Sequence, residues 1–202
     1  MLEKSKEYLD LINIYKELHK HGVNKEKSEN TFDGKSLKDY IIAIKQLIDK
    51  YNCKSIIDFG CGKAKLYNEK IFVNNTSYKN VLDYWKVKDY ILYDPAYYKY
   101  EQYPDRKKDC VICTDVIEHI PPQDVSQLIK EIFSLANKAV FINIAGYKAI
   151  KSLPDGRNVH LSIKSSKEWE NIIAKIKMEF PHIHPIVIFS PKWNEHKIIY
   201  DL

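Results

Sequence analysis

Two glycines separated by one residue lie at the end of an apolar run that contains an acid. The stretch is IIDFGCGKAKLY, and it includes Asp58, Gly60 and Gly62. Glycines at this spacing let a backbone approach a ligand closely, and ligands of parallel sheets bind beyond the carboxyl ends of the strands. A carboxylate beside such a loop attracts a positively charged group strongly in a partly dry pocket. The stretch therefore predicts a site for a ligand that carries positive charge.

Three ligands compete for a loop of this kind. A phosphate loop of the Walker type needs GxxxxGK[ST], which the residues after Gly60 do not fit. A dinucleotide loop needs GxGxxG, and Lys65 stands at the third glycine position. A pyrophosphate also gains nothing from Asp58, whereas the ammonium and sulfonium of S-adenosylmethionine do. The stretch therefore favours S-adenosylmethionine.

Two more acids end predicted strands further along the chain. Asp94 closes YILYD before Pro95, and Asp115 closes DCVICTD before Val116. A carboxylate in such a place can accept hydrogen bonds from both hydroxyls of a ribose. Each acid also has an ordinary explanation, because Asp94 precedes a proline turn and Asp115 could cap the entry to a helix. From the residues alone, both explanations stay open for each acid.

These segments together resemble a known family. IIDFGCGKA resembles the first motif of class I S-adenosylmethionine-dependent methyltransferases, acid-x-Gly-x-Gly-x-Gly, with Ala64 at the last glycine. YILYDPA resembles the second motif, and KDCVICTDVIEHIPP resembles the fourth-strand motif of the small-molecule branch. The resemblance implies methyl transfer with S-adenosyl-L-methionine as the cofactor. It assigns cofactor binding to Asp58, Gly60, Cys61, Gly62, Asp94, Pro95, Asp115 and Val116.

Two histidines are the candidates for catalysis. His119 follows Glu118, which could orient it as a general base, although a role in packing the turn is the alternative. His160 lies in the polar loop KSLPDGRNVHLSIK, which by resemblance overhangs the methyl group and helps to select the acceptor. We predict that one of the two removes a proton from an acceptor O–H or N–H group.

The cysteines indicate neither a metal site nor disulfides. Cys110 and Cys113 form a CxxC pattern, but they lie in a predicted strand, where residues three apart point to opposite faces. Their thiols could not easily share a metal ion. We therefore expect core packing from the cysteines and no metal site.

The elements around these residues predict an α/β fold. Apolar strands at 54–59, 89–94, 109–115 and 138–146 alternate with amphipathic helices at 36–51, 124–137 and from Ser165 onward. Capping boxes are expected at Ser36–Asp39 and Ser165–Glu168. Such alternation indicates a Rossmann-like, doubly wound and mostly parallel sheet. Helix 3–20 would add an N-terminal helical segment over the crevice, and residues 184–202 would add a C-terminal antiparallel hairpin.

The family pattern is altered at three places. Residues 67–88 form an insertion, in which we expect a helix around Trp85. The short span between Asp94 and Asp109 leaves little room for the usual third strand and its helix, so no residue can be assigned to the adenine. Ala64 is a small departure if its position is helical, because alanine lacks only the positive-φ freedom of glycine.

Composition limits the remaining classes of function. The 202 residues, 45% of them hydrophobic, suit one domain over 1–202, with an N-terminal segment at 1–35 and a core at 36–202. The net charge of +5 is spread along the chain without a basic block. The chain shows neither a signal peptide nor an apolar run long enough to span a membrane, so we expect a cytoplasmic protein.

Two alternatives to a small-molecule methyl acceptor remain open. A nucleic-acid methyltransferase of the common base-amino type would carry an Asn/Asp-Pro-Pro-aromatic tetrad, where this chain has TDVIEHIPP. The Pro-Cys nucleophile of cytosine C5 chemistry is also missing, and no basic stripe with stacking aromatic residues occurs. A non-catalytic binder of S-adenosylmethionine is the second alternative, and the change at Ala64 favours it.

Overall fold

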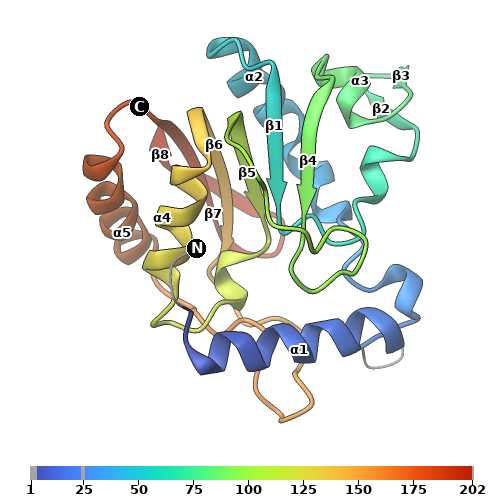
Figure 1. Ribbon diagram of the computed structural model, residues 1–202, viewed down its shortest axis with the longest axis vertical. Coiled ribbons are helices and arrows are strands. Elements are labelled where there is room, and N and C mark those ends of the chain that lie inside the picture. Colours follow the sequence, from blue (N-terminus) through green and yellow to red (C-terminus); the bar gives the residue numbers. More distant parts are fainter. Residues whose placement is uncertain (1–3, 24–25, 202) are drawn as a thin grey trace.

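The structure, a computed structural model, describes residues 4–23 and 26–201, and the predictions that touch residues 1–3, 24, 25 and 202 lie outside them. Its main sheet has six strands in the order β4-β1-β5-β6-β7-β8. All neighbours are parallel except β7 and β8, which confirms the mostly parallel sheet and the C-terminal hairpin (Figure 1). The strands are β1 (Ser55–Phe59), β4 (Asp89–Tyr93), β5 (Lys108–Thr114), β6 (Ala136–Ala145), β7 (His184–Lys192) and β8 (Glu195–Asp201).

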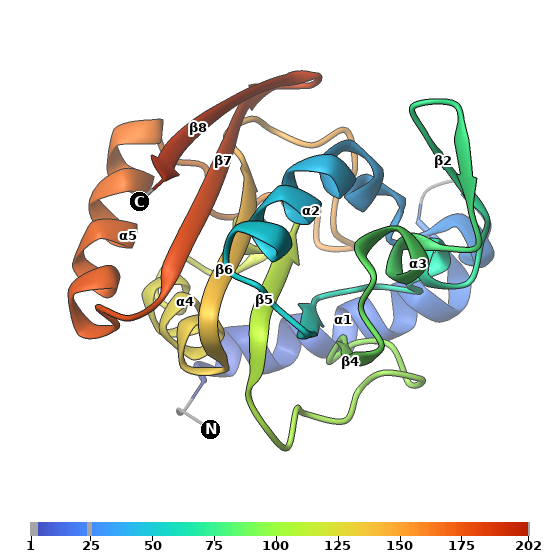
Figure 2. The ribbon, with the colours of Figure 1, turned by 90° about the horizontal axis from the view of Figure 1, so that it is seen from above.

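Helices cover both faces of this sheet (Figure 2). α2 (Ile41–Lys50) and α3 (Val81–Trp85) pack on one face, and α4 (Val125–Ser134) and α5 (Ser166–Glu179) pack on the other. The alternation of side chains along the strands divides the core accordingly, since Cys110 packs on the α2 side and Cys113 on the α4 side. The sheet is therefore doubly wound, and the two cysteines of the CxxC pattern lie on opposite faces.

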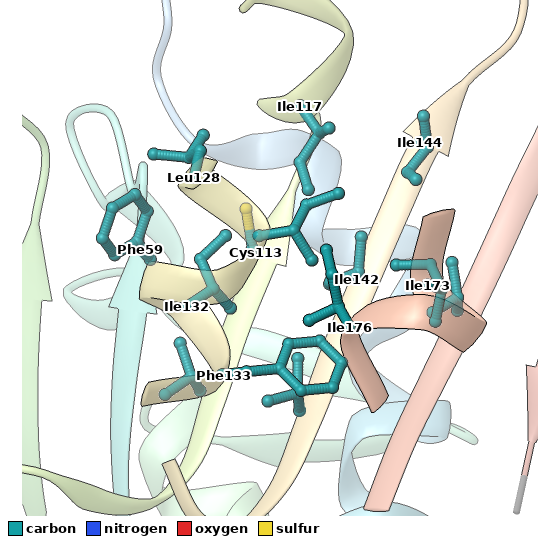
Figure 3. Close-up of a cluster of buried hydrophobic side chains, with 14 of the residues drawn as sticks. Phe59, Cys113, Ile117, Leu128, Ile132, Phe133, Ile142, Ile144, Ile173 and Ile176 are labelled. Atoms are coloured by element: carbon teal, nitrogen blue, oxygen red, sulfur yellow. The ribbon is translucent and has the colours of Figure 1, made fainter. Parts of the chain in front are cut away.

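The core between the sheet, α4 and α5 is fully closed to solvent (Figure 3). Leu128, Ile132 and Phe133 of α4 have exposed fractions of 1% or less, because their helical spacing places them on one face. Trp169 and Ile173 of α5 are equally buried. Burial of each such side chain contributes about 1.5–3 kcal/mol, so this core fixes the carboxyl ends of β1 and β5.

Helix boundaries correct the sequence prediction at two places. A 3₁₀ helix, Lys35–Tyr40, precedes α2, and Ser36 forms no capping box. Asp33 instead accepts the backbone N–H of Lys35, 3.0 Å away. The helix predicted to reach residue 137 ends at Ser134, since β6 already pairs with β5 at Ala136. The capping box at Ser165 is confirmed.

The helix α1 (Lys6–His21) crosses the carboxyl ends of the strands (Figure 1). Ser5 caps its first turn and donates its own backbone N–H to Asp124, 2.9 Å away, at the start of α4. At the other end, Lys63 donates to the carbonyl oxygens of Ser28 and Thr31, each 2.6 Å away. A short 3₁₀ helix, Ser28–Asn30, lies in this connection. The N-terminal segment therefore lies over the crevice, as predicted.

The insertion after the glycine loop forms a small unit at the edge of the molecule. It contains a 3₁₀ helix (Lys65–Tyr67), an antiparallel pair of strands, β2 (Ile71–Val73) and β3 (Thr76–Tyr78), and the predicted helix α3. Buried Trp85 donates its ring N–H to the carbonyl oxygen of Ile41 at 3.0 Å.

The part of the sheet next to this unit is shortened. Residues 95–107 contain no strand, so β4 forms the edge of the sheet. None of the helices within residues 4–23 and 26–201 has the length and apolar character that a membrane span requires.

Candidate active site

One cavity lies where the carboxyl ends of β1, β4 and β5 meet α1. Its volume is about 130 Å³, and the loops after the three strands, the segment 32–36 and one side of α1 form its wall. Seven of the predicted site residues line this cavity: Gly60, Gly62, Asp94, Pro95, Asp115, Val116 and His119. Asp58, Cys61 and His160 are not in its lining. Residues from three separate motifs thus meet at one place.

The two glycines of the loop are required by their conformation and by their neighbours. Gly60 and Gly62 have φ angles of 84° and 56°, which disfavour other residues. A Cβ atom on Gly60 would lie 2.3 Å from Cγ2 of Val116, and one on Gly62 would lie 2.3 Å from the carbonyl oxygen of Phe32. The backbone of the loop therefore forms part of the cavity wall itself.

Ala64, at the last glycine position, is not helical, so the condition under which alanine is a small departure is not met. Its φ is 50° and its ψ is 41°, so it lies in the left-handed region. Its side chain is buried against the α2 side of the core. The chain thus adopts the backbone that glycine would favour at this position, and holds it with alanine.

Asp94 joins the loop after β4 to the glycine loop. Its carboxylate accepts the N–H groups of Gly62 and Ala96, each at 2.9 Å, and only 9% of the residue is exposed. Burial raises the pKa of Asp94, while these two donors favour its ionised form. A carboxylate oxygen can accept more than one hydrogen bond, and Asp94 lines the cavity. Asp94 can therefore position the loop and also accept hydrogen bonds from a ligand.

Asp58 and Cys61 lie beneath the loop. Asp58 is in β1 on the same side as Ile56 and is 3% exposed, and burial raises its pKa to about 7. The thiol of Cys61 is also buried, which raises its pKa well above the usual value. Contact of either side chain with a cofactor stays a prediction.

His119 lies at the junction of α1 and the loop after β5. It ends the 3₁₀ helix η4 (Ile117–His119), and its Nδ1 is 2.8 Å from the hydroxyl of Tyr15. Burial lowers the pKa of His119 to about 4, so the ring is neutral at pH 7. Glu118 does not orient this ring as expected, because its Oε1 accepts the N–H of Ala145 at 2.8 Å. Tyr15 holds His119 instead.

His160 lies behind His119, outside the cavity lining. The two rings meet edge to face with centroids 4.8 Å apart. Nδ1 of His160 is 2.6 Å from the carbonyl oxygen of Tyr147, so that nitrogen carries the proton. Asn158 accepts the backbone N–H of His160 at 3.0 Å. The loop after β6 thus brings His160 beside His119.

Sequence reasoning missed the aromatic side of the cavity. Tyr15 packs against Phe32, and His19 packs between Phe32 and Tyr97, with ring centroids 5.1–5.2 Å apart. These residues belong to no motif. The available signal was helical spacing, since Tyr8, Ile12, Tyr15 and His19 share one side of α1 and all four line the cavity.

The Asp, Glu, Lys and Arg side chains that line the cavity, among the described residues, are all acidic. Among the described residues, no Lys or Arg lines it, whereas Asp94 and Asp115 do. A phosphate would find no cationic side chain here, and a positively charged ligand would find two carboxylates. Ribose hydroxyls and a flat apolar ring would also find partners in Asp94 and in the aromatic wall. The residues present therefore fit S-adenosylmethionine better than a nucleotide phosphate.

Comparison with known proteins agrees with this geometry. A family model described as a methyltransferase domain matches residues 24–175. Comparisons with curated proteins and with solved structures gave no match. The matched region begins after α1 and contains the glycine loop, Asp94, Asp115 and both histidines. Because it covers well over half of the 202 residues, the chain belongs to the methyltransferase domain family.

Proposed function

We propose that this protein transfers a methyl group from S-adenosyl-L-methionine to a small-molecule acceptor. The observation that carries the proposal is the cavity at the ends of β1, β4 and β5. It combines a glycine backbone, the buried carboxylate of Asp94 and an aromatic wall, and no Lys or Arg of the described chain lines it. The membership of the methyltransferase domain family supports the reaction type.

The loops after β1 and β4 would hold the cofactor. Gly60 and Gly62 allow its amino-acid part to lie against the backbone, and Asp94 would accept from the ribose hydroxyls. Pro95 and Val116 give the cavity apolar walls on either side of the loop. Because the pKa of Asp58 is about 7, part of this carboxyl group is ionised at pH 7. The positive charge of a bound cofactor above the loop would favour the ionised form.

The chemistry asks little of the protein beyond alignment. When bound, S-adenosylmethionine supplies a methyl group, which an acceptor lone pair takes as the carbon–sulfur bond breaks and its electrons stay on sulfur. Helix α1 lines the cavity with Tyr8, Ile12 and Tyr15, which reduces the polar surface beside the reacting atoms. His119 is the neutral imidazole at the wall, with His160 behind it, and these are the groups proposed to act on the acceptor.

The cover over the cavity supports a small acceptor. α1 is fixed at its start by Asp124 and near its end by Lys63, and the loop after β6 packs against it through Leu153 and Val159. A long polymer needs an open groove, whereas α1 lines one side of this cavity. A steep loss of binding to RNA or DNA with rising salt would argue for a nucleic acid instead.

Thermal unfolding with four separate ligands tests the proposed cofactor. S-adenosylmethionine and S-adenosylhomocysteine at 100 times their dissociation constants should each stabilise the fold by about 2.7 kcal/mol. NAD and ATP should leave the unfolding temperature unchanged. Stabilisation by NAD or ATP alone, or by none of the four, would contradict the proposal.

A further inference from the structure

A cluster of metal-ligating side chains lies at one wall of the cavity. Asp115, His119 and His160 each offer one ligand atom, and these atoms all lie within 4.8 Å of one another. They come from the end of β5, from η4 and from the loop after β6. Asp115 has a φ of 60°, the left-handed backbone that disfavours ordinary residues. The fold thus brings one carboxylate and two imidazoles together beside the place where an acceptor would bind.

His160 has the hydrogen bond of a metal ligand. It donates Nδ1–H to the carbonyl oxygen of Tyr147, which leaves the lone pair of Nε2 available. Nδ1 of His119 lies 2.8 Å from the hydroxyl of Tyr15, a partner that a metal ion bound at this nitrogen would displace. Histidines that bind metals usually donate the other ring N–H to a carbonyl or carboxylate, which fixes the tautomer and the ring orientation.

Glu118 adds an independent observation. Its side chain is fully buried, Oε1 accepts from Ala145, and the described residues offer no hydrogen-bond partner to Oε2. Glu118 directly precedes His119 in η4, although its carboxylate is not one of the ligand atoms that lie within 4.8 Å of one another. A buried carboxylate oxygen without a partner is costly, and a bound cation would offset that cost.

We propose that Asp115, His119 and His160 bind one divalent transition-metal ion, with the buried carboxylate of Glu118 nearby. Two imidazole nitrogens favour ions such as Zn²⁺ or Co²⁺ over Mg²⁺ and Ca²⁺, which prefer oxygen ligands alone. With a metal ion bound, the two histidines would act on the acceptor through the ion instead of as general bases. The second half of the inference rests on the proposed function: an open position on the ion would take an acceptor oxygen and lower the pKa of its O–H group.

Titration with Co²⁺ tests the site in the absence of any adenosyl ligand. Metal-free protein should bind one equivalent of Co²⁺ with saturating visible absorption, and Zn²⁺ should displace it while Mg²⁺ should not. His119→Gln and His160→Gln should each weaken Co²⁺ binding at least tenfold. His21→Gln is the matched control, because His21 is an exposed histidine of α1 that pairs with Glu17 at 3.4 Å and is not in the cluster.

Three results overturn the site: no stoichiometric Co²⁺ binding, unchanged Co²⁺ binding in both ligand variants, or loss in the control alone. Circular dichroism of each variant shows whether it folds, and the absorption of the unaltered protein keeps the test decisive if a variant does not. S-adenosylhomocysteine binding is measured separately. Binding of S-adenosylhomocysteine without Co²⁺ binding overturns only the metal site. Co²⁺ binding without S-adenosylhomocysteine binding supports the metal site and contradicts the proposed function.

Discussion

The hydroxyl of Tyr15 lies 2.8 Å from Nδ1 of His119, and this contact joins α1 to the loop after β5. Its two partners are 104 positions apart in the sequence. Tyr15 also packs edge to face against Phe32, so it contacts the glycine-loop side of the cavity as well. Helix α1, which covers the cavity, and the loop with His119 are therefore directly connected.

Replacement of Tyr15 by Phe should separate these two parts without removing the ring. The variant loses one hydrogen bond and should lower the free energy of unfolding by about 0.5–1.5 kcal/mol. Because the hydroxyl occupies Nδ1 of His119, its removal should also raise the affinity for Co²⁺. Urea unfolding and the Co²⁺ titration measure the two effects. Tyr98→Phe, at a residue 75% exposed, is the control and should change neither quantity. If Tyr15→Phe also left both the free energy of unfolding and the Co²⁺ affinity unchanged, the proposed coupling between Tyr15 and His119 would be contradicted.

Gly62→Ala should be far more damaging than an ordinary glycine substitution. Its Cβ would lie 2.3 Å from the backbone oxygen of Phe32 in addition to the strain at φ 56°. We expect a loss of about 2–4 kcal/mol in the free energy of unfolding. Gly156→Ala is the control, since Gly156 has φ 86° but no atom within 4 Å of a Cβ, so it reports the strain alone. Equal losses in the two variants would show that the approach of Phe32 is unimportant.

Asp58 should make stability depend on pH. Its folded-state pKa of about 7 lies above its ordinary 3.8, so the folded protein binds this proton more tightly than the unfolded chain does. The resulting stability is complete below about pH 4 and is lost as the pH rises to 7. At pH 8 the free energy of unfolding of Asp58→Asn should therefore exceed that of the unaltered protein by on the order of 2–4 kcal/mol, and at pH 4 the two values should match.

Urea unfolding of ligand-free protein between pH 4 and pH 8 measures this difference for Asp58→Asn. Asp105→Asn serves as the exposed control and should show no such trend. A difference between Asp58→Asn and the unaltered protein that stays constant over the whole range would rule out burial of a titrating Asp58.

Lys63 should hold the cover closed. Its ammonium donates to Ser28 and Thr31 at 2.6 Å and to His19 at 3.4 Å, so one side chain binds α1 and its connection to the glycine loop. Lys63→Met keeps the apolar stem but leaves these carbonyls without their donor, at a cost of about 1–3 kcal/mol. Hydrogen exchange in the last turn of α1 should become faster. Lys65→Met, which removes a more exposed contact to Asn30, should leave that exchange unchanged.

The strand ends were predictable because their chemistry is local. An apolar run that stops at Asp94 or Asp115 predicts both a strand and the place where it ends. The parallel sheet then brings those ends together. The same logic placed Gly60 and Gly62 at the cavity.

The contribution of α1 was not predictable in the same way. Tyr15 and His19 reach the site only through tertiary packing of a helix that carries no motif, so their sequence neighbours say nothing of Phe32 or His119. Strand alternation also turned Asp58 beneath the loop. At Ala64, a left-handed backbone is imposed by surrounding contacts, such as the bond from Lys63 N–H to Phe32. Non-local contacts decided each of these positions.

Calorimetric titration of S-adenosylhomocysteine tests the central claim, that the cavity beside Asp94 binds the adenosyl cofactor. The unaltered protein should bind one equivalent, and Asp94→Asn should weaken binding at least about tenfold, or 1.4 kcal/mol, because the buried carboxylate faces the ligand. Asp105→Asn, an exposed residue away from the cavity, should bind as the unaltered protein does. No binding by the unaltered protein, or equal affinity in folded Asp94→Asn, would contradict this account.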